Sequence, residues 1–394
     1  MLTLLANADV YAPEPLGIKS LLVAGSSIVW LGNAPPRMPQ ALGVRTRDLA
    51  GRRLIPGLID IHVHITGGGG EAGAHSKVPP LPLSRFTRNG ITSVVGLLGT
   101  DDATRHPREL VTAAYGLRAE GISAWCLTAG YHLPPVTITG SVRGDIAHVD
   151  PIIGAKTAIS DHRSSQPTVQ ELLHLASEVH VGGLMTGKAG ILHMHVGDGE
   201  RGLEIIREAL HGSELPPHVF NPTHVNRRKA LFEEAMELAR AGCHVDISAF
   251  PVSEGEDAWT APEALLRYLD SGAPGDRVSV SSDGGGCLGV FDAEGRVTSM
   301  AVGDPGSPAF ALRTLVGAGA PLERVLPAFT RNPARLMRLT GKGHIAVGAH
   351  ADLVVLDERG GVTDVMARGR WHVVESALQV AGTFDEPAAR TVAG

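Results

Sequence analysis

Six residues whose side chains can bind metal ions follow one another in a fixed order along the chain. His62 and His64 form a His-x-His pair, and residues two apart on a strand point to the same side. The set continues with a lysine, two more histidines and an aspartate: Lys156, His195, His224 and Asp283. Four imidazoles with a carboxylate suit two divalent ions, with zinc as the first expectation. Two such ions can hold a hydroxide between them at neutral pH, so the expected chemistry is hydrolysis.

Lys156 is the least ordinary member of this set, because it stands alone in the apolar run 152–159. A buried, unpaired ammonium is costly, so a lysine in such a run usually extends its charged end to solvent. The alternative is that carbon dioxide carbamylates the lysine. The side chain then loses its positive charge and gains a carboxylate group that can bridge two metal ions. Taken alone, the position favours the first interpretation. With five other ligands in order, we predict the carbamate.

A repeating pattern of strands and helices must position these side chains. Eight apolar segments recur about every thirty residues, the length of a strand–helix unit. The predicted strands are residues 57–63, 91–97, 122–127, 152–157, 190–196, 218–222, 244–249 and 278–282. The six ligands lie at or near the ends of these strands. Eight such units can close into a (β/α)8 barrel, which is the fold that we predict, and an open doubly wound sheet is the alternative.

The segments between the strands carry helix signals. Apolar residues at helical spacing occupy 231–239, and Gly242 stands where a helix would stop. Thr260 and Glu263 form a capping box at the start of another helix. The run of four glycines at 67–70 lacks the dinucleotide-binding pattern, and we interpret it as a flexible loop.

The sequence patterns at both ends of the chain predict short strands instead of strand–helix units. These strands are residues 2–5, 20–24, 27–31, 352–356 and 363–367. We therefore expect one small β-sandwich domain built from both termini. The predicted limits are 1–55 and 344–394 for its two parts and 56–343 for the barrel.

The composition excludes several classes of protein. Hydrophobic residues make up 43% of the 394 residues, which excludes disorder as the main state. The net charge is −6 and no basic run occurs, so we expect no nucleic-acid partner. No apolar run is long enough for a membrane span, and the first residues lack the pattern of a signal peptide. The three cysteines lie far apart, which argues against a disulfide framework and predicts a reducing, cytoplasmic location.

The ordered ligands resemble those of the amidohydrolase superfamily. Stretches around them are similar to one of its families, the isoaspartyl dipeptidases (β-aspartyl peptidases), and the likeness extends over nearly the whole chain. The matching stretches are 56–64 (PGLIDIHVH), 67–71 (GGGGE), 131–140 (YHLPPVTITG) and 158–164 (AISDHRS). The resemblance implies a centre of two metal ions with a carbamylated Lys156, and isoaspartyl dipeptides as small-molecule substrates.

The resemblance also implies which residues contact the substrate. Glu71 resembles the family's acid that pairs with the free α-amine of the dipeptide. Arg163 and Arg227 resemble the arginines that bind its carboxylates, for which a planar guanidinium is suited. Thr100 is expected to add a hydroxyl group.

The same resemblance assigns the reaction itself to two residues. Tyr131 donates to the carbonyl oxygen as charge develops there, and Asp283 takes the proton of the hydroxide and passes it to the leaving amine. The chain departs from the family at Cys287, where the family has a serine four residues after the aspartate. Gly284–Gly286 let the chain turn back over the metals, so Cys287 is expected at the substrate, with a thiol that donates less strongly than a hydroxyl.

Two other functions stay open at this point. One is a cyclic amidase similar to dihydroorotase or hydantoinase, whose substrates lack a free ammonium and would leave Glu71 without a role. The other is a metal-free relative that acts as an interaction module, which should have lost the ligands that this chain keeps. The family also implies a homo-oligomer, with an octamer as one form.

Overall fold

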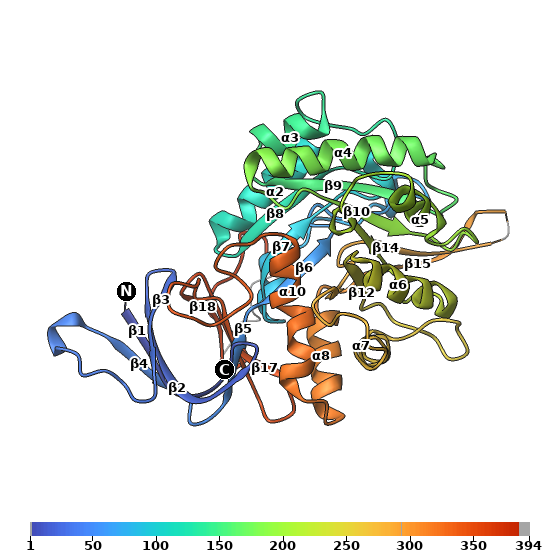
Figure 1. Ribbon diagram of the computed structural model, residues 1–394. Coiled ribbons are helices and arrows are strands. Elements are labelled where there is room, and N and C mark those ends of the chain that lie inside the picture. The colour runs from blue at the N-terminus through green and yellow to red at the C-terminus, as the bar shows by residue number, and fades with distance from the viewer. Residues whose placement is uncertain (1, 293, 386–394) are drawn as a thin grey trace, which may run out of the picture.

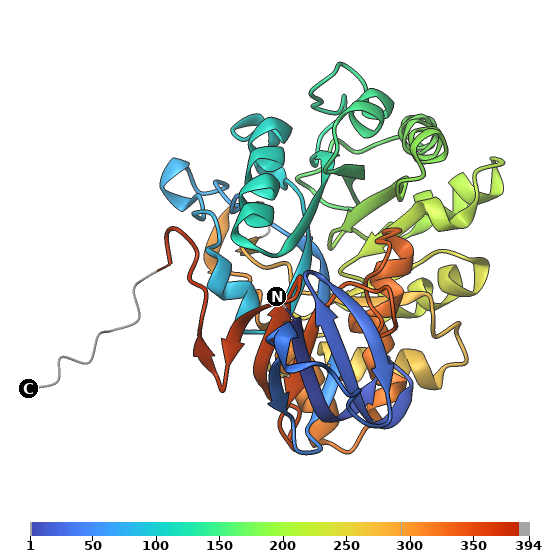
Figure 2. The same ribbon diagram turned by 90° about the vertical axis from the view of Figure 1, so that its left-hand side faces the viewer.

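The computed structural model describes residues 2–292 and 294–385. It consists of a barrel of eight parallel strands and a second sheet formed by both ends of the chain (Figure 1). Figure 2 views the molecule from the side of this terminal sheet, with the barrel behind it. The predicted fold class is confirmed.

The barrel strands coincide with the eight strands predicted from the sequence. They are β6 (Leu58–Val63), β7 (Ile91–Gly96), β8 (Ser123–Ala129), β9 (Ile152–Ile159), β10 (Ile191–Val196), β11 (Phe220–Thr223), β12 (Val245–Ser248) and β13 (Val278–Ser281). They pair in chain order. The first and last strands then meet, because Val63 pairs with Gly284 and the Ser282 N–H donates to Asp60 Oδ1 (3.2 Å). This closure excludes the open sheet.

Helices cover the outside of the barrel (Figure 1). Those described are α1 (Leu83–Thr87), α2 (Pro107–Glu120), α3 (Val142–His148), α4 (Val169–Thr186), α5 (Glu204–His211), α6 (Lys229–Ala241), α7 (Ala261–Asp270), α8 (Ser307–Gly317), α9 (Leu322–Val325) and α10 (Arg331–Leu336). Gly242 ends α6 with a φ of 111°, and Thr260 and Glu263 form the capping box of α7, both as predicted. Within 2–292 and 294–385, no helix has the length and hydropathy to cross a membrane.

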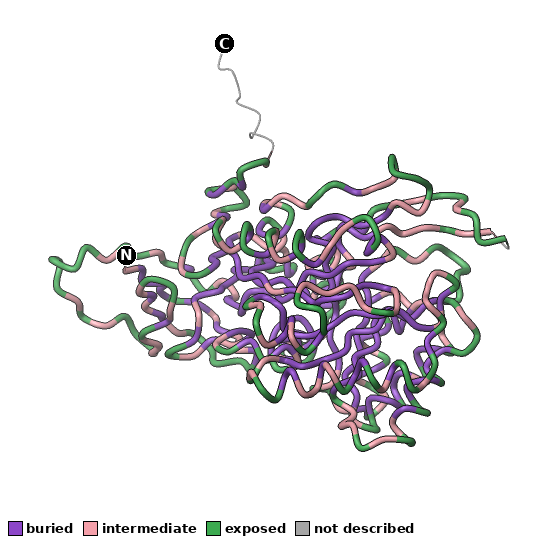
Figure 3. The backbone as a smooth tube through the Cα atoms, turned by 90° about the horizontal axis from the view of Figure 1, so that it is seen from above, coloured by how far each residue is buried: buried purple, intermediate pink, exposed green. Residues whose placement is uncertain are grey.

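The barrel interior is apolar at one end and polar at the other. Apolar side chains such as Ile61, Val95 and Leu127 form a cluster that also includes Met337 at the carboxyl end of α10. A larger apolar layer lies between the strands and the helices, so the buried residues run through the centre of the molecule in Figure 3. The carboxyl ends of the strands instead carry buried histidine, lysine and aspartate side chains, for which the apolar layers provide a rigid support.

The terminal sheet joins the two ends of the chain. Its strands are β1 (Leu2–Tyr11), β2 (Pro15–Ala24), β3 (Ser27–Gly32), β4 (Arg45–Asp48), β5 (Arg53–Pro56), β16 (Leu353–Leu356), β17 (Val362–Ala367), β18 (Arg370–Val374) and β19 (Ala377–Leu378). The antiparallel pairing of β5 with β16 brings the two ends together. All five predicted terminal strands are present, while the domain limits 1–55, 56–343 and 344–394 stay a prediction.

Two features near the carboxyl ends of the barrel strands differ from the prediction or were absent from it. A hairpin of β14 (Cys287–Phe291) and β15 (Val297–Val302) follows β13 and lies at the end of the barrel away from the terminal sheet (Figure 1). The four-glycine run is a closely packed segment and not the loose loop that we expected. A Cβ on Gly67, whose φ is +74°, would lie 1.9 Å from the Val78 carbonyl oxygen.

Candidate active site

A cavity of about 940 Å³ opens at the carboxyl ends of the barrel strands. Ten of the twelve residues predicted for the site line it: His64, Glu71, Thr100, Tyr131, Arg163, His195, His224, Arg227, Asp283 and Cys287. The other two lie next to them, since His62 Nε2 is 3.2 Å from Asp283 Oδ1 and 3.5 Å from Lys156 Nζ. The structure therefore brings all twelve predicted residues together.

His62, His64 and Asp283 form one compact group of potential metal ligands. The Nε2 atoms of both histidines lie 3.2 Å from Asp283 Oδ1, and the three atoms are within 4.8 Å of one another. Burial lowers the pKa of His62 to about 3, so this imidazole is neutral at pH 7, the form that binds metals. Asp283 has a φ of 53°, in the left-handed region that most side chains avoid and that aspartate adopts more readily than most. This group could hold one metal ion.

His195 and His224 lie beside that group, with their ring centroids 4.7 Å apart. Ser248 Oγ is 2.6 Å from His224 Nδ1, which leaves Nε2 of that ring for another partner. Asp161 Oδ2 accepts from His195 Nε2 (2.7 Å), so Nδ1 of His195 is the nitrogen without a proton. The sequence analysis did not find the supporting roles of Ser248 and Asp161, although Asp161 stands in the matching stretch 158–164.

Lys156 is completely buried, which excludes the interpretation in which its charged end reaches solvent. Its Nζ makes no ion pair within 4.0 Å in the described part of the chain, and its nearest polar contact is His62 Nε2. Burial lowers the pKa of Lys156 to about 7. A buried amine that is about half neutral at pH 7, among four histidines and an aspartate, fits a site for divalent ions.

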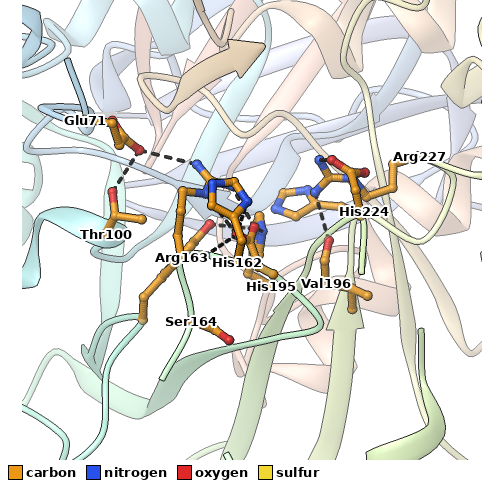
Figure 4. A network of polar contacts seen from close by, with 12 residues as sticks. Glu71, Thr100, His162, Arg163, Ser164, His195, Val196, His224 and Arg227 are labelled. Carbon is orange, nitrogen blue, oxygen red and sulfur yellow. Dashed lines mark hydrogen bonds and ion pairs between the residues drawn. The ribbon is translucent and has the colours of Figure 1, made fainter. Parts of the chain in front are cut away.

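Figure 4 shows an acid, a hydroxyl and a guanidinium that meet on one wall of the cavity. Glu71 Oε1 accepts from Thr100 Oγ1 (2.8 Å) and lies 3.4 Å from Arg163 Nη1. Glu71 Oε2 is buried and has no hydrogen-bond partner among the described residues. Arg163 is held in turn by Asp161, through Nε (3.0 Å) and Nη2 (2.7 Å). The wall therefore offers one acidic oxygen with capacity for a cationic ligand.

Arg227 lies beside His224, apart from Glu71 (Figure 4). Its Nη1 donates to the Val196 carbonyl (2.8 Å), and its Nε lies 2.7 Å from Asp198 Oδ1. The backbone contact and the ion pair hold the guanidinium at the cavity, although Asp198 already neutralises part of its charge.

Tyr131 follows β8 and is a buried part of the cavity wall. Its hydroxyl lies 2.5 Å from His195 Nδ1, to which it donates. Burial raises the pKa of Tyr131 well above its usual value. The phenol therefore stays protonated at neutral pH and can act as a hydrogen-bond donor.

Cys287, the first residue of β14, is half-buried in the cavity wall beside Glu71. Burial and the Glu71 carboxylate raise the pKa of Cys287 to about 12. Near neutral pH the residue is therefore a thiol, and a thiolate that would repel a substrate carboxylate does not form.

This raised pKa predicts an unusual pH dependence for alkylation of Cys287. Against an ordinary pKa of 9.0, a shift to about 12 lowers the thiolate fraction about a thousandfold at pH 8. We expect the rate of reaction with iodoacetamide to be low at pH 8 and to rise about tenfold per pH unit up to about pH 11. The measurement is labelling by mass spectrometry, and a plateau near pH 9 would contradict it.

The serine variant supplies the control for that experiment and tests the role of the thiol. Cys287→Ser should resist iodoacetamide, because Cys126 and Cys243 are buried. A hydroxyl donates more strongly than a thiol, so the variant should also have a lower KM for the isoaspartyl dipeptides that the resemblance implies as substrates. Equal KM values, together with equal sensitivity to the reagent at pH 11, would show that Cys287 does not contact the substrate.

Three further residues, one in the cavity wall and two beneath it, were not found by the sequence analysis. His193 and Asp246 lie beneath the ligands, and their side chains form a second group with His62 in which the potential ligand atoms lie within 4.8 Å of one another. His193 stands in the His-x-His stretch of β10, so its spacing from His195 was a visible signal. Phe291 of the hairpin gave no such signal, and its ring lies 4.9 Å from Arg163 Cζ.

The comparison with protein families agrees with this geometry. The amidohydrolase family model matches residues 53–372. Among curated proteins, the imidazolonepropionase of Paracoccus denitrificans (strain Pd 1222) is 25% identical over 361 residues, which cover 86% of this chain and 88% of that protein. The family match covers the barrel together with its ligand-bearing strand ends.

Similar solved structures indicate which family within the superfamily the chain resembles. One is the beta-aspartyl dipeptidase of Fervidobacterium islandicum AW-1 in complex with beta-Asp-Leu dipeptide, which is 38% identical with a TM-score of 0.90 and covers 96% of this chain and 99% of that chain. A D-hydantoinase, 15% identical with a TM-score of 0.67 and a coverage of 98% of both chains, shares the fold. The chain therefore belongs to the amidohydrolase superfamily of metal-dependent hydrolases, in its isoaspartyl (beta-aspartyl) dipeptidase family.

Proposed function

We propose that this enzyme hydrolyses the amide bond between the side-chain carboxyl of an aspartyl residue and the next residue in β-aspartyl dipeptides. The observation that carries the proposal is the contact network of Glu71, Thr100 and Arg163 in the same cavity as the histidines. A β-aspartyl dipeptide has a free α-amine and two free carboxylates around its scissile bond. A site for such a dipeptide therefore needs one acid and cationic partners close to the hydrolytic centre. The likeness to beta-aspartyl dipeptidase structures supports the proposed function.

The proposal includes two divalent metal ions, with zinc as the expected metal. His62, His64 and Asp283 would hold one ion, and a second group would hold the other: His195 and His224, with a carbamylated Lys156 as the bridge. Imidazole and carboxylate donors suit zinc, and the burial of Lys156 supports a modified, uncharged nitrogen. Bound ions would supply a hydrolytic nucleophile at neutral pH and polarise the scissile carbonyl.

The residues of this chain bind and orient the dipeptide. Glu71 accepts the α-ammonium group through the oxygen that has no other partner among the described residues, while Thr100 keeps the carboxylate in place. Arg163 and Arg227 bind the two carboxylates of the substrate. Held at three charged groups, the dipeptide presents its amide carbonyl to the ligands at the bottom of the cavity.

Two further residues act on the reacting atoms. Tyr131 donates to the carbonyl oxygen as negative charge develops there. Asp283 accepts a proton from the attacking water and transfers it to the leaving amine as the C–N bond breaks. One water molecule is consumed, and aspartate and the second amino acid are released.

Hydrolysis of a panel of compounds by the zinc-loaded enzyme tests the function. We expect β-Asp-Leu to be hydrolysed, with little turnover of α-Asp-Leu, dihydroorotate or hydantoin. Release of leucine is measured by amino-acid analysis, and ring opening by loss of ultraviolet absorbance. Faster turnover of dihydroorotate or hydantoin than of β-Asp-Leu would replace the dipeptidase with a cyclic amidase.

Glu71→Gln tests recognition of the free amine. The variant keeps the hydrogen bond from Thr100 but loses the charge, so kcat/KM for β-Asp-Leu should fall about 10- to 100-fold. N-acetyl-β-Asp-Leu has no ammonium group and should be hydrolysed by both proteins at similar, low rates. Equal losses on the two substrates would instead mean that Glu71 acts by holding Arg163.

The location and assembly of the enzyme stay proposals as well. Cys126, Cys243 and Cys287 are all free thiols, which supports a reducing compartment such as the cytoplasm. A homo-oligomer, with an octamer as one form, is proposed from the family resemblance, and light scattering of the purified protein measures it.

A further inference from the structure

A buried row of polar side chains lies directly beneath His62 and takes no part in the proposed reaction. His193 of β10 and Asn221 of β11 are both fully buried. His62 Nδ1 lies 2.8 Å from His193 Nε2, and His193 Nδ1 lies 2.6 Å from Asn221 Oδ1. Asn221 Nδ2 donates to the backbone carbonyl of His244 (2.7 Å). The row therefore joins His62 to a backbone group through three hydrogen bonds.

The carbonyl at the end of the row sets the direction of every hydrogen bond in it. A backbone carbonyl only accepts, so Asn221 turns its amide nitrogen to His244 and its oxygen to His193. That oxygen also only accepts, so His193 carries its proton on Nδ1 and leaves Nε2 as an acceptor. His62 must then carry its own proton on Nδ1. Its Nε2 keeps a free lone pair, and this atom faces Asp283 Oδ1 at 3.2 Å.

We propose that His193 and Asn221 are positioning residues that hold His62 in the tautomer able to bind a metal ion through Nε2. The inference rests on the proposed function, because it takes His62 as a metal ligand. Without an acceptor beneath it, His62 would carry its proton on Nε2 and donate to Asp283. That hydrogen bond would occupy two metal-binding atoms at once. The row keeps both atoms free for the ion.

A metal ion between His62 and His193 is the competing interpretation, because Asp246 completes a group of three there. Two nitrogens on one tetrahedral zinc ion stand roughly 3.3 Å apart when each bond is about 2.05 Å long. The observed 2.8 Å is instead an ordinary hydrogen-bond distance. Asp246 is also engaged elsewhere, since it accepts from three hydroxyl groups at 2.5 to 2.7 Å. The geometry favours the hydrogen bond over a lower metal site.

Zinc binding to the metal-free, full-length protein tests the proposal without any substrate. His193→Phe removes the acceptor but fills the space, and the zinc dissociation constant should rise about 10- to 100-fold. His193→Gln keeps an oxygen acceptor toward His62 and should stay within about threefold of the parent. His244→Phe is the matched control, because this buried barrel histidine takes part in the row only through its backbone. Competition with a chromophoric chelator gives each constant.

Equal zinc affinities of His193→Phe and His244→Phe overturn the proposal. If His193→Phe does not fold, Asn221→Leu takes its place, because it leaves His193 free to carry its proton on either nitrogen and should also weaken zinc binding. Long-range ¹H–¹⁵N spectra of the metal-free parent need no variant: a proton on His62 Nδ1 supports the proposal, and one on Nε2 overturns it. None of these measurements involves a dipeptide, so their failure is distinguishable from failure of the dipeptidase assignment.

Discussion

Replacing Asp283 by Asn is expected to lower kcat for β-Asp-Leu by at least about a thousandfold. The amide has the size of the carboxylate but cannot accept a proton from the attacking water. It also binds metal ions weakly, and Asp283 Oδ1 is the atom that both His62 and His64 face at 3.2 Å. Steady-state kinetics and the metal content of the purified variant, measured by mass spectrometry, check the two parts of this prediction.

Asp304→Asn is the control for that experiment. Asp304 lies beyond the hairpin, is exposed and pairs with Arg85 on the surface, so its loss should leave kcat and the metal content close to those of the parent. An Asp283→Asn variant that keeps more than a tenth of the parent rate would remove Asp283 from the proposed proton transfer.

Lys156→Ala should lose at least one metal ion and most of the activity. The lysine is completely buried, and burial lowers its pKa to about 7, so a large share of the amine is neutral near pH 7. Only a neutral amine reacts with carbon dioxide, and the resulting carbamate is the proposed bridge. Alanine leaves a space in which a small carboxylate can substitute for it. Formate, acetate or propionate should therefore partly restore both metal content and rate.

The carbamate can also be detected directly in the parent protein. Metal-loaded enzyme prepared with ¹³C-bicarbonate should show one carbamate signal in the ¹³C spectrum, and Lys156→Ala should lack it. Lys188→Ala is the matched control, because Lys188 is a partly buried lysine that donates to two backbone carbonyls. A Lys156→Ala protein that retains both metals and the full rate would contradict the bridging role.

The positions of the barrel strands and the end at which the ligands gather could be predicted from the sequence. Most of the barrel strands are rich in apolar residues, because a parallel strand is buried on both faces. The carboxyl ends of parallel barrel strands lie at the same end of the barrel. Residues at these strand ends, such as His62 and Asp283, therefore come close together regardless of the conformation of the loops. The capping box of Thr260 and Glu263 was equally predictable, since it depends on four consecutive residues alone.

The hairpin and the glycine run could not be predicted in the same way. Most residues of β14 and β15 are partly or fully exposed, so the segment shows no alternation between a buried and an exposed face. The conformation of the glycine run depends on backbone that packs against it from elsewhere in the chain, at Val78 and Gly285. Neither feature has a local pattern from which its structure follows.

The sequence by itself determined the strand–helix units, the ligand types and the end of the barrel that carries them. The tertiary structure alone decided which side chains support those ligands and whether the sheet closes. Ser248 contacts His224 across 24 residues of sequence, and the Ser282 N–H meets Asp60 across 222. Such contacts depend on which strands become neighbours. A closed barrel and an open sheet use the same units and differ in the pairing of the first strand with the last, which no local pattern encodes.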